Sequence, residues 1–86
     1  MQPTPPFWFK QRQGKLELVR DNTYKATAPN QGEAFLAIRP GPDGRWEAAV
    51  RGTADGADLA ITGPEFESPT QAWEAAFELY RRTLVV

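Results

Sequence analysis

The sequence SPTQAWEAAFELYRR, residues 68–82, has the start signal and the periodicity of one amphipathic helix, and it is the most informative segment for the fold. Ser68 is a good N-cap, Pro69 takes the first helical position, and Gln71 follows at the third, as in a capping box. The apolar residues recur at helical spacing and form one stripe: Ala72, Trp73, Ala76, Phe77 and Tyr80. We therefore expect a C-terminal helix whose stripe packs against an apolar surface elsewhere in the chain.

The segments before this helix are short, apolar and separated by turn signals, as in an antiparallel sheet. The strongest turn, PGPDG at residues 40–44, separates expected strands at residues 33–39 and 45–51. Three alternating residues of the second strand share one face and are natural partners of the helix stripe: Trp46, Ala48 and Val50.

Further strands are expected at residues 7–12, 15–20, 23–28 and 59–62. The dipeptides Gln13-Gly14 and Asp21-Asn22 are interpreted as two-residue turns that join the first three of these strands. Strands first and one helix last indicate an α+β fold. We expect an antiparallel sheet of about five strands, built from β-hairpins, with one C-terminal helix packed on one face.

Length and composition indicate one small domain. The chain has 86 residues. Residues 1–6 contain three prolines, and we expect a disordered leader there. A single α+β domain is expected over residues 7–86.

The two N-terminal turns predict which side chains share a face of the sheet. Two-residue turns would pair Arg12 with Lys15, and Val19 with Tyr24. One face would carry Trp8, Val19, Tyr24, Lys10, Arg12, Lys15 and Glu17, and the other Phe7, Phe9, Leu16 and Leu18. Both faces would then be partly apolar, although one helix covers only one of them. A slip of one residue in either turn would exchange the faces.

The composition excludes several kinds of chemistry. Without histidine or cysteine, the chain cannot form a disulfide, bind zinc through imidazole or thiolate, or use a histidine base. Four carboxylates match no calcium-loop spacing and are interpreted as solvated loop charges: Asp55, Asp58, Glu65 and Glu67. We therefore expect no catalytic residue, no metal site, no cofactor and no enzymatic activity.

Charge and hydropathy bear on partners and location. Ten basic and eleven acidic residues give a net charge of −1, which implies no bulk attraction to nucleic acid. No apolar run reaches membrane-spanning length, and the N-terminus lacks a signal-peptide pattern. We expect a cytoplasmic protein without a membrane partner.

Two functions remain, a protein-interaction module and a single-stranded nucleic-acid-binding domain. The first is favoured because apolar groups on both expected hairpin faces need cover, from a protein partner or from a second copy in a homodimer. The alternative uses an aromatic-basic sheet face, on which bases stack and cations meet phosphates. Its candidate binding residues are Trp8, Lys10, Arg12, Lys15 and Tyr24. The simpler interpretation of the same aromatic residues is core packing.

The second half of the chain is similar to small bacterial and phage domains. The residues that carry the resemblance are Asp43-Gly44-Arg45-Trp46, Phe66, Ser68, Ala72-Trp73 and Ala75-Ala76. The resemblance implies a hairpin, an acidic loop and a capped helix, and no particular activity.

Overall fold

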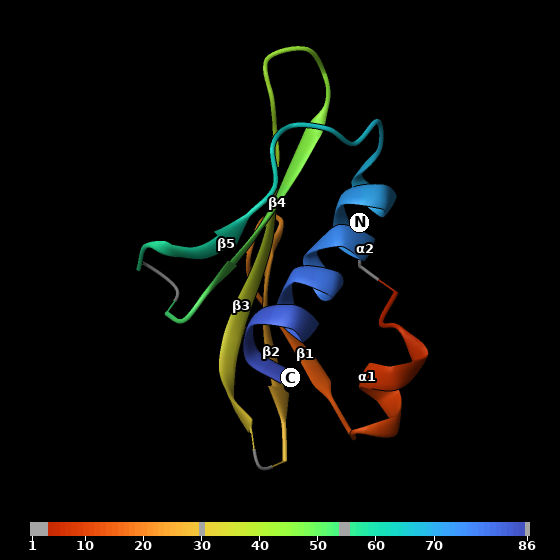
Figure 1. The fold of residues 1–86 in the computed structure, drawn as a ribbon, viewed down its shortest axis with the longest axis vertical. Coiled ribbons are helices and arrows are strands. Elements are labelled where there is room, and N and C mark those ends of the chain that lie inside the picture. The colour runs from red at the N-terminus through yellow and green to blue at the C-terminus, as the bar shows by residue number, and fades with distance from the viewer. Residues whose placement is uncertain (1–3, 30, 54–55, 86) are drawn as a thin grey trace.

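The computed structural model describes residues 4–29, 31–53 and 56–85. Within these ranges the elements are, in chain order, α1 (Phe7–Gln11), β1 (Lys15–Arg20), β2 (Thr23–Ala28), β3 (Gln31–Pro40), β4 (Trp46–Arg51), β5 (Asp58–Ile61), α2 (Pro69–Tyr80) and the π-helical segment η1 (Arg81–Val85). The strands form one open antiparallel sheet in the order β1-β2-β3-β4-β5 (Figure 1). Each strand therefore lies beside its neighbour in sequence.

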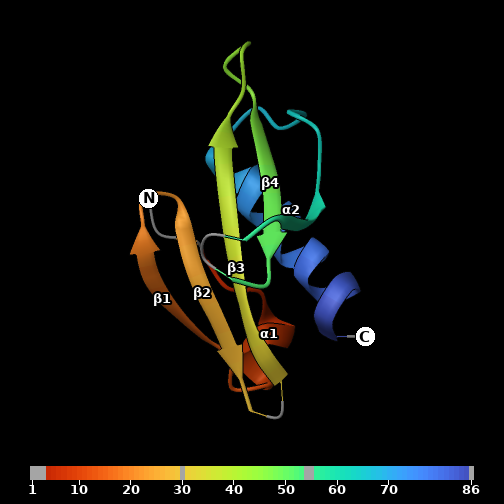
Figure 2. The same ribbon diagram turned by 90° about the vertical axis from the view of Figure 1, so that its left-hand side faces the viewer.

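Both helices of the described chain lie on the same side of the sheet (Figures 1 and 2). α2 packs across β3 and β4, near the middle of the sheet. We call the side that the helices cover the helix face, and the opposite side the outer face. β1 and β5 are the two edge strands. This arrangement confirms the expected α+β class, with a C-terminal helix on one face of an antiparallel sheet.

α2 begins where the sequence predicts it. Ser68 Oγ accepts a hydrogen bond from the Gln71 backbone N–H at 3.2 Å, and Pro69 is the first helical residue. In a capping box the Gln71 side chain would accept a hydrogen bond from the Ser68 N–H. Here its Oε1 accepts from the N–H of the preceding residue, Glu67, at 2.9 Å. The cap satisfies an N–H group that the first helical turn leaves without a partner in the helix.

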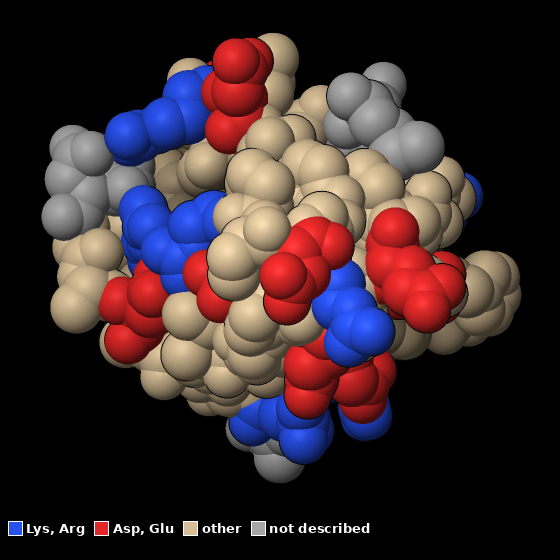
Figure 3. Space-filling view, turned by 90° about the horizontal axis from the view of Figure 1, so that it is seen from above, with Lys and Arg blue, Asp and Glu red and all other residues tan. Residues whose placement is uncertain are grey.

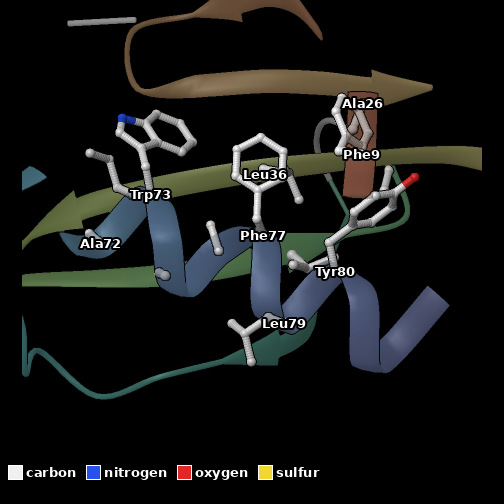
Figure 4. Packing of buried hydrophobic residues seen from close by; sticks show 13 residues of the cluster. Phe9, Ala26, Leu36, Ala72, Trp73, Phe77, Leu79 and Tyr80 are labelled. Carbon is white, nitrogen blue, oxygen red and sulfur yellow. The ribbon is translucent and has the colours of Figure 1, made fainter. Parts of the chain in front are cut away.

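The apolar stripe of α2 forms the core together with β3 and β4. Trp73, Phe77 and Tyr80 project from α2 toward the strands (Figure 4). The strand side of this core consists of buried residues that alternate along β3 and β4: Leu36, Ile38, Ala48 and Val50. Trp46 packs at the border of the same cluster. The predicted partnership between the helix stripe and one face of residues 45–51 is confirmed.

The strand expected at residues 7–12 is wrong, because the segment forms helix α1 instead. The Pro6 carbonyl starts this helix by accepting hydrogen bonds from the N–H groups of Phe9 and Lys10, at 3.1 and 3.2 Å. The helical turn places Phe9 in the core, only 1% exposed, with its ring centroid 5.4 Å from that of Phe77. An aromatic run typical of a strand is helical here because its burial against α2 outweighs local preference.

The dipeptide Gln13-Gly14, expected as a hairpin turn, forms the C-terminal cap of α1. Gln13 takes a left-handed conformation with φ 59°. Its N–H donates to the Lys10 carbonyl, and the Gly14 N–H donates to the Phe9 carbonyl, at 3.0 and 2.9 Å. This pair of hydrogen bonds is a Schellman motif, which ends a helix. The expected first hairpin therefore does not form.

The second hairpin forms, but most of its register differs from the expected one by one residue. Leu18 pairs with Tyr24, and Arg20 pairs with Thr23, so Val19 is a bulge between the two pairs. Tyr24 lies on the helix face, where it pairs with Leu36 of β3, and the shift places Leu18 beside it instead of Val19. The expected aromatic-basic sheet face does not form, because Trp8 lies on helix α1 and only Tyr24 lies on a strand.

Part of the expected leader is described. Residues 1–3 lie outside the described residues, as does Asp55 among the expected loop charges. Thr4 is exposed, whereas Pro5 and Pro6 are half-buried. Pro6 belongs to the start of α1 through its carbonyl.

Candidate interaction surfaces

The two aromatic residues of the expected binding site are both packed against α2, at different places. Trp8 stacks on Tyr80, with ring centroids 6.0 Å apart and an interplanar angle of 27°. Tyr24 on β2 meets Trp73 edge-on, at 5.5 Å and 81°. Each is half-buried and borders the core. Both rings therefore help to hold α2 on the sheet.

The three expected cations divide between two surfaces. Lys10 and Arg12 are exposed, on α1 and at its C-terminal cap. Lys15 begins β1 and, by strand alternation from the half-buried Leu16, lies on the outer face. The structure thus keeps the first two cations with Trp8 on α1 and separates the third from them.

α1 also exposes an aromatic residue that was not among the expected binding residues. Phe7 is 73% exposed and lies three positions before Lys10, so the two share one side of the helix. The stacking of Trp8 on Tyr80 brings α1 close to the end of α2. Burial raises the pKa of the Tyr80 hydroxyl, and the nearby positive charge of Arg12 partly opposes this shift.

Most exposed apolar side chains gather on the two edges of the sheet. Five large apolar side chains are exposed in the described part of the chain, and four of them lie on edge strands. β1 carries Leu18, 62% exposed, and Val19, 40% exposed. β5 carries Leu59, 54% exposed, and Ile61, 49% exposed. The sequence predicts a strand at residues 59–62 but no role for it, because the only signal there is the uncharged run from Leu59 to Ile61.

A cluster of ion pairs crosses the outer face from β3 to β5. Asp58 accepts hydrogen bonds from Arg51 Nε at 2.8 Å and from Arg39 Nη2 at 3.1 Å. Arg39 Nε also lies 2.9 Å from a Glu47 carboxylate oxygen. The hydrogen bond from Arg51, and after it that from Arg39, holds the pKa of the Asp58 carboxyl below its ordinary value. Asp58 is thus part of the folded sheet and not the solvated loop charge expected from the sequence.

This cluster explains why small residues on the outer face are buried without a helix above them. Ala49 on β4 is 0% exposed, and its neighbour Ala37 on β3 is 3% exposed. Arg39 lies on β3 and Asp58 on β5, so their salt bridge spans β4, where Ala49 lies. The partly buried side chains of this cluster therefore lie over the small residues of the outer face and shield them from solvent.

The remaining charges of the described surface are mixed in sign. Near β1, Lys25 Nζ lies 3.1 Å from a Glu17 carboxylate oxygen on the outer face. Seen from above, Lys and Arg side chains are interspersed with Asp and Glu side chains (Figure 3). No broad field of one sign faces the viewer there, so this end offers no general attraction for a polyanion.

The described ranges hold no group of three or more histidine, cysteine, aspartate or glutamate side chains that could bind a metal ion. In the same part of the chain, no helix combines the length and the apolar character needed to cross a membrane. Comparisons with protein-family models, with curated proteins and with solved structures find no match to this chain.

Proposed function

We propose that the chain is a non-enzymatic protein-interaction module, which binds a protein partner or a second copy of itself through an edge of its sheet. The observation that carries this proposal is the location of the exposed apolar side chains on β1 and β5. An edge strand presents backbone N–H and C=O groups to which another strand can add. Apolar side chains beside that edge would be buried by the added strand, which favours its binding.

The rest of the fold suits this mode of binding. α1 and α2 pack on one face of the sheet, and the ion pairs of Asp58 brace the other. The edges are therefore held in an extended conformation before a partner arrives. Such preorganisation lowers the entropic cost of association.

Site-specific photo-crosslinking in cells tests the proposal whatever protein the partner is. A photoreactive phenylalanine analogue replaces Leu18 on β1 or Leu59 on β5, and replaces the exposed Glu74 on α2 as a matched control. We expect covalent adducts with protein from an edge position and none from position 74. Adducts from neither edge, or equal yields from all three positions, would contradict the proposal.

A second candidate function is weak binding of single-stranded nucleic acid, and the exposed side of α1 favours it. Phe7 is 73% exposed, Lys10 lies on the same side of the helix, and Arg12 follows at its end. An exposed ring beside cations can stack on a base while the cations contact phosphates. With a net charge of −1, we expect such binding only at low salt.

An oligonucleotide titration at low salt, followed through backbone amide shifts, tests this second candidate. We expect shifts over residues 7–15 that vanish when salt is added and that are lost in Phe7→Ala and Lys10→Glu. Phe7 is a cleaner target than Trp8, because Trp8 stacks on Tyr80 and its removal would disturb the fold. A low-salt titration that shifts no amide would rule this candidate out.

A further inference from the structure

We propose that β5 is the edge that associates, and that its occupant is a second copy of this chain, paired antiparallel to it across a two-fold axis. The inference rests on the proposed function and names its surface and its partner. Four observations support it. The edge strand β1 carries exposed charges, whereas the one charge of β5 is paired within the chain. The β5 backbone presents hydrogen-bonding groups to the open edge, and the order of its side chains is self-complementary.

The edge strand β1 carries features that discourage pairing. Three of its six residues are exposed and charged: Lys15, Glu17 and Arg20. Exposed charges on an edge strand protect it against pairing with another chain. The ladder of each edge strand shifts register once, at Val19 in β1 and at Leu59 in β5, so these irregularities do not distinguish the two edges. β1 is therefore the less suitable edge for self-association, although Leu18 is exposed there.

β5 presents apolar side chains without a charge directed at an incoming strand. Its one charged residue, Asp58, is engaged by Arg39 and Arg51 on the outer face. Leu59 and Ile61 are 54% and 49% exposed. Because the Asp58 charge is paired within each copy, two β5 strands can approach without bringing uncompensated like charges together.

The hydrogen bonds between β4 and β5 turn the backbone of Ile61 toward the open edge. The Thr62 N–H donates to the Ala48 carbonyl at 2.9 Å, and the next pair along the ladder is Ile61 with Ala49. Hydrogen-bonded and non-hydrogen-bonded pairs alternate in an antiparallel ladder. The N–H and C=O groups of Ile61 therefore point away from β4, where a further strand would meet them.

An antiparallel pair centred on Ala60 makes two β5 strands complementary. Leu59 of one copy then lies opposite Ile61 of the second copy, and the same contact occurs a second time across the axis. Directly opposed side chains on neighbouring strands have Cβ atoms about 4.5–5.5 Å apart, close enough for leucine and isoleucine to pack. The two sheets become continuous, and the features of β1 keep further copies from adding at the outer edges.

The contact is small, so we expect a weak dimer. β5 spans four residues, and its ladder with β4 shifts register at Leu59. Stable interfaces bury about 1,200–2,000 Å² in total, and a single short strand pair reaches at most the lower end of this range. We therefore expect a dissociation constant between micromolar and millimolar.

Analytical ultracentrifugation of the full chain, from micromolar to millimolar concentration, measures this equilibrium. We expect a monomer–dimer equilibrium that Ile61→Lys weakens at least about tenfold, since the lysine charge would be desolvated in the paired edge. The matched control is Leu18→Lys on β1, which makes the same kind of change at a comparably exposed site and should leave the equilibrium unchanged. Thermal unfolding of each variant verifies that it is folded.

A single cysteine at position 60 tests the register independently, including the case in which Ile61→Lys does not fold. The chain has no cysteine, so Ala60→Cys introduces one thiol in each copy. In the proposed pairing, residue 60 opposes its own symmetry mate in a non-hydrogen-bonded pair, with Cα atoms about 4.5 Å apart, within disulfide range. We expect a disulfide-linked dimer on mild oxidation, and none from Leu18→Cys.

The outcomes separate this inference from the proposed function. Association that persists in Ile61→Lys and is lost in Leu18→Lys would overturn the assignment to β5 and leave the proposed function standing. A chain that stays monomeric at millimolar concentration would overturn self-association. In that case, photo-crosslinks from an edge to other proteins would still support the proposed function, and their absence would remove both proposals.

Discussion

Gly14 has no side chain, and this allows the Phe9 ring of α1 to pack directly against its backbone. A Cβ atom at this position would lie 2.5 Å from ring atoms of Phe9. The Phe9 ring is 1% exposed and packs against Phe77 and Tyr80, so it has no room to move aside. The glycine is required by this close approach, since the left-handed conformation of the cap belongs to its neighbour Gln13.

The substitution Gly14→Ala should therefore lower the free energy of unfolding by about 1–3 kcal/mol, the usual cost of overpacking. Gly52→Ala is the matched control, because its new Cβ would lie 3.6 Å from Leu59, an ordinary contact. Urea denaturation of both variants measures the difference. Equal stability of the two would contradict the docking of the Phe9 ring beside position 14.

Among the elements, α1 can be distinguished from the strand expected at residues 7–12 by two substitutions. On a strand, Phe7 and Phe9 would share a face and be buried alike. In α1, Phe9 is 1% exposed and Phe7 is 73% exposed. Phe9→Ala should therefore destabilise the fold by about 3–5 kcal/mol, and Phe7→Ala by less than about 0.5 kcal/mol. Similar losses in chemical denaturation would favour the strand.

α2 depends on its N-cap in a way that can be measured. Ser68→Ala removes the Oγ that accepts from the Gln71 N–H, and we expect a loss of about 1 kcal/mol in unfolding free energy. Glu74→Ala changes an exposed site on the same helix and should leave stability within about 0.5 kcal/mol. If the two variants melt at the same temperature, the cap contributes nothing to stability.

For the molecule as a whole, the ion pairs on the outer face couple stability to pH. The pKa of the Asp58 carboxyl is lowered from 3.8, first by the hydrogen bond from Arg51 and further by the one from Arg39. A carboxyl whose pKa is lowered in the folded state stabilises that state above its ordinary pKa. This contribution is lost as the pH falls below 3.8 and through the folded pKa.

The variant Asp58→Asn should be less stable than the wild type at neutral pH and should approach it as the solution is acidified. Urea titrations from about pH 7 to about pH 2 follow the two free energies of unfolding. Glu78→Gln is the control, because Arg81 also lowers the pKa of Glu78, but on a more exposed helix surface where the effect on stability is smaller. A difference between Asp58→Asn and the wild type that does not change with pH would contradict this account.

The elements whose signals are short-range can be predicted from the amino-acid sequence alone. The cap at Ser68, the stripe of α2 and the PGPDG turn between β3 and β4 each involve residues only a few positions apart. Hydrogen bonds and periodicity within one element are enough to specify such features. The α+β class followed from their order along the chain. The absence of histidine and cysteine likewise needed no structure.

Features that depend on residues far apart in the chain become visible only in the folded molecule. The aromatic run at residues 7–12 is helical because Phe9 finds its burial against Phe77, far along the chain. Tyr24 lies on the helix face because it pairs with Leu36 of β3, and Trp73 of α2 meets it there edge-on. The sequence also does not show which strands form the edges of the sheet, because this depends on the order of all five strands. A local pattern cannot show what will cover a side chain, because burial is a property of the assembled molecule.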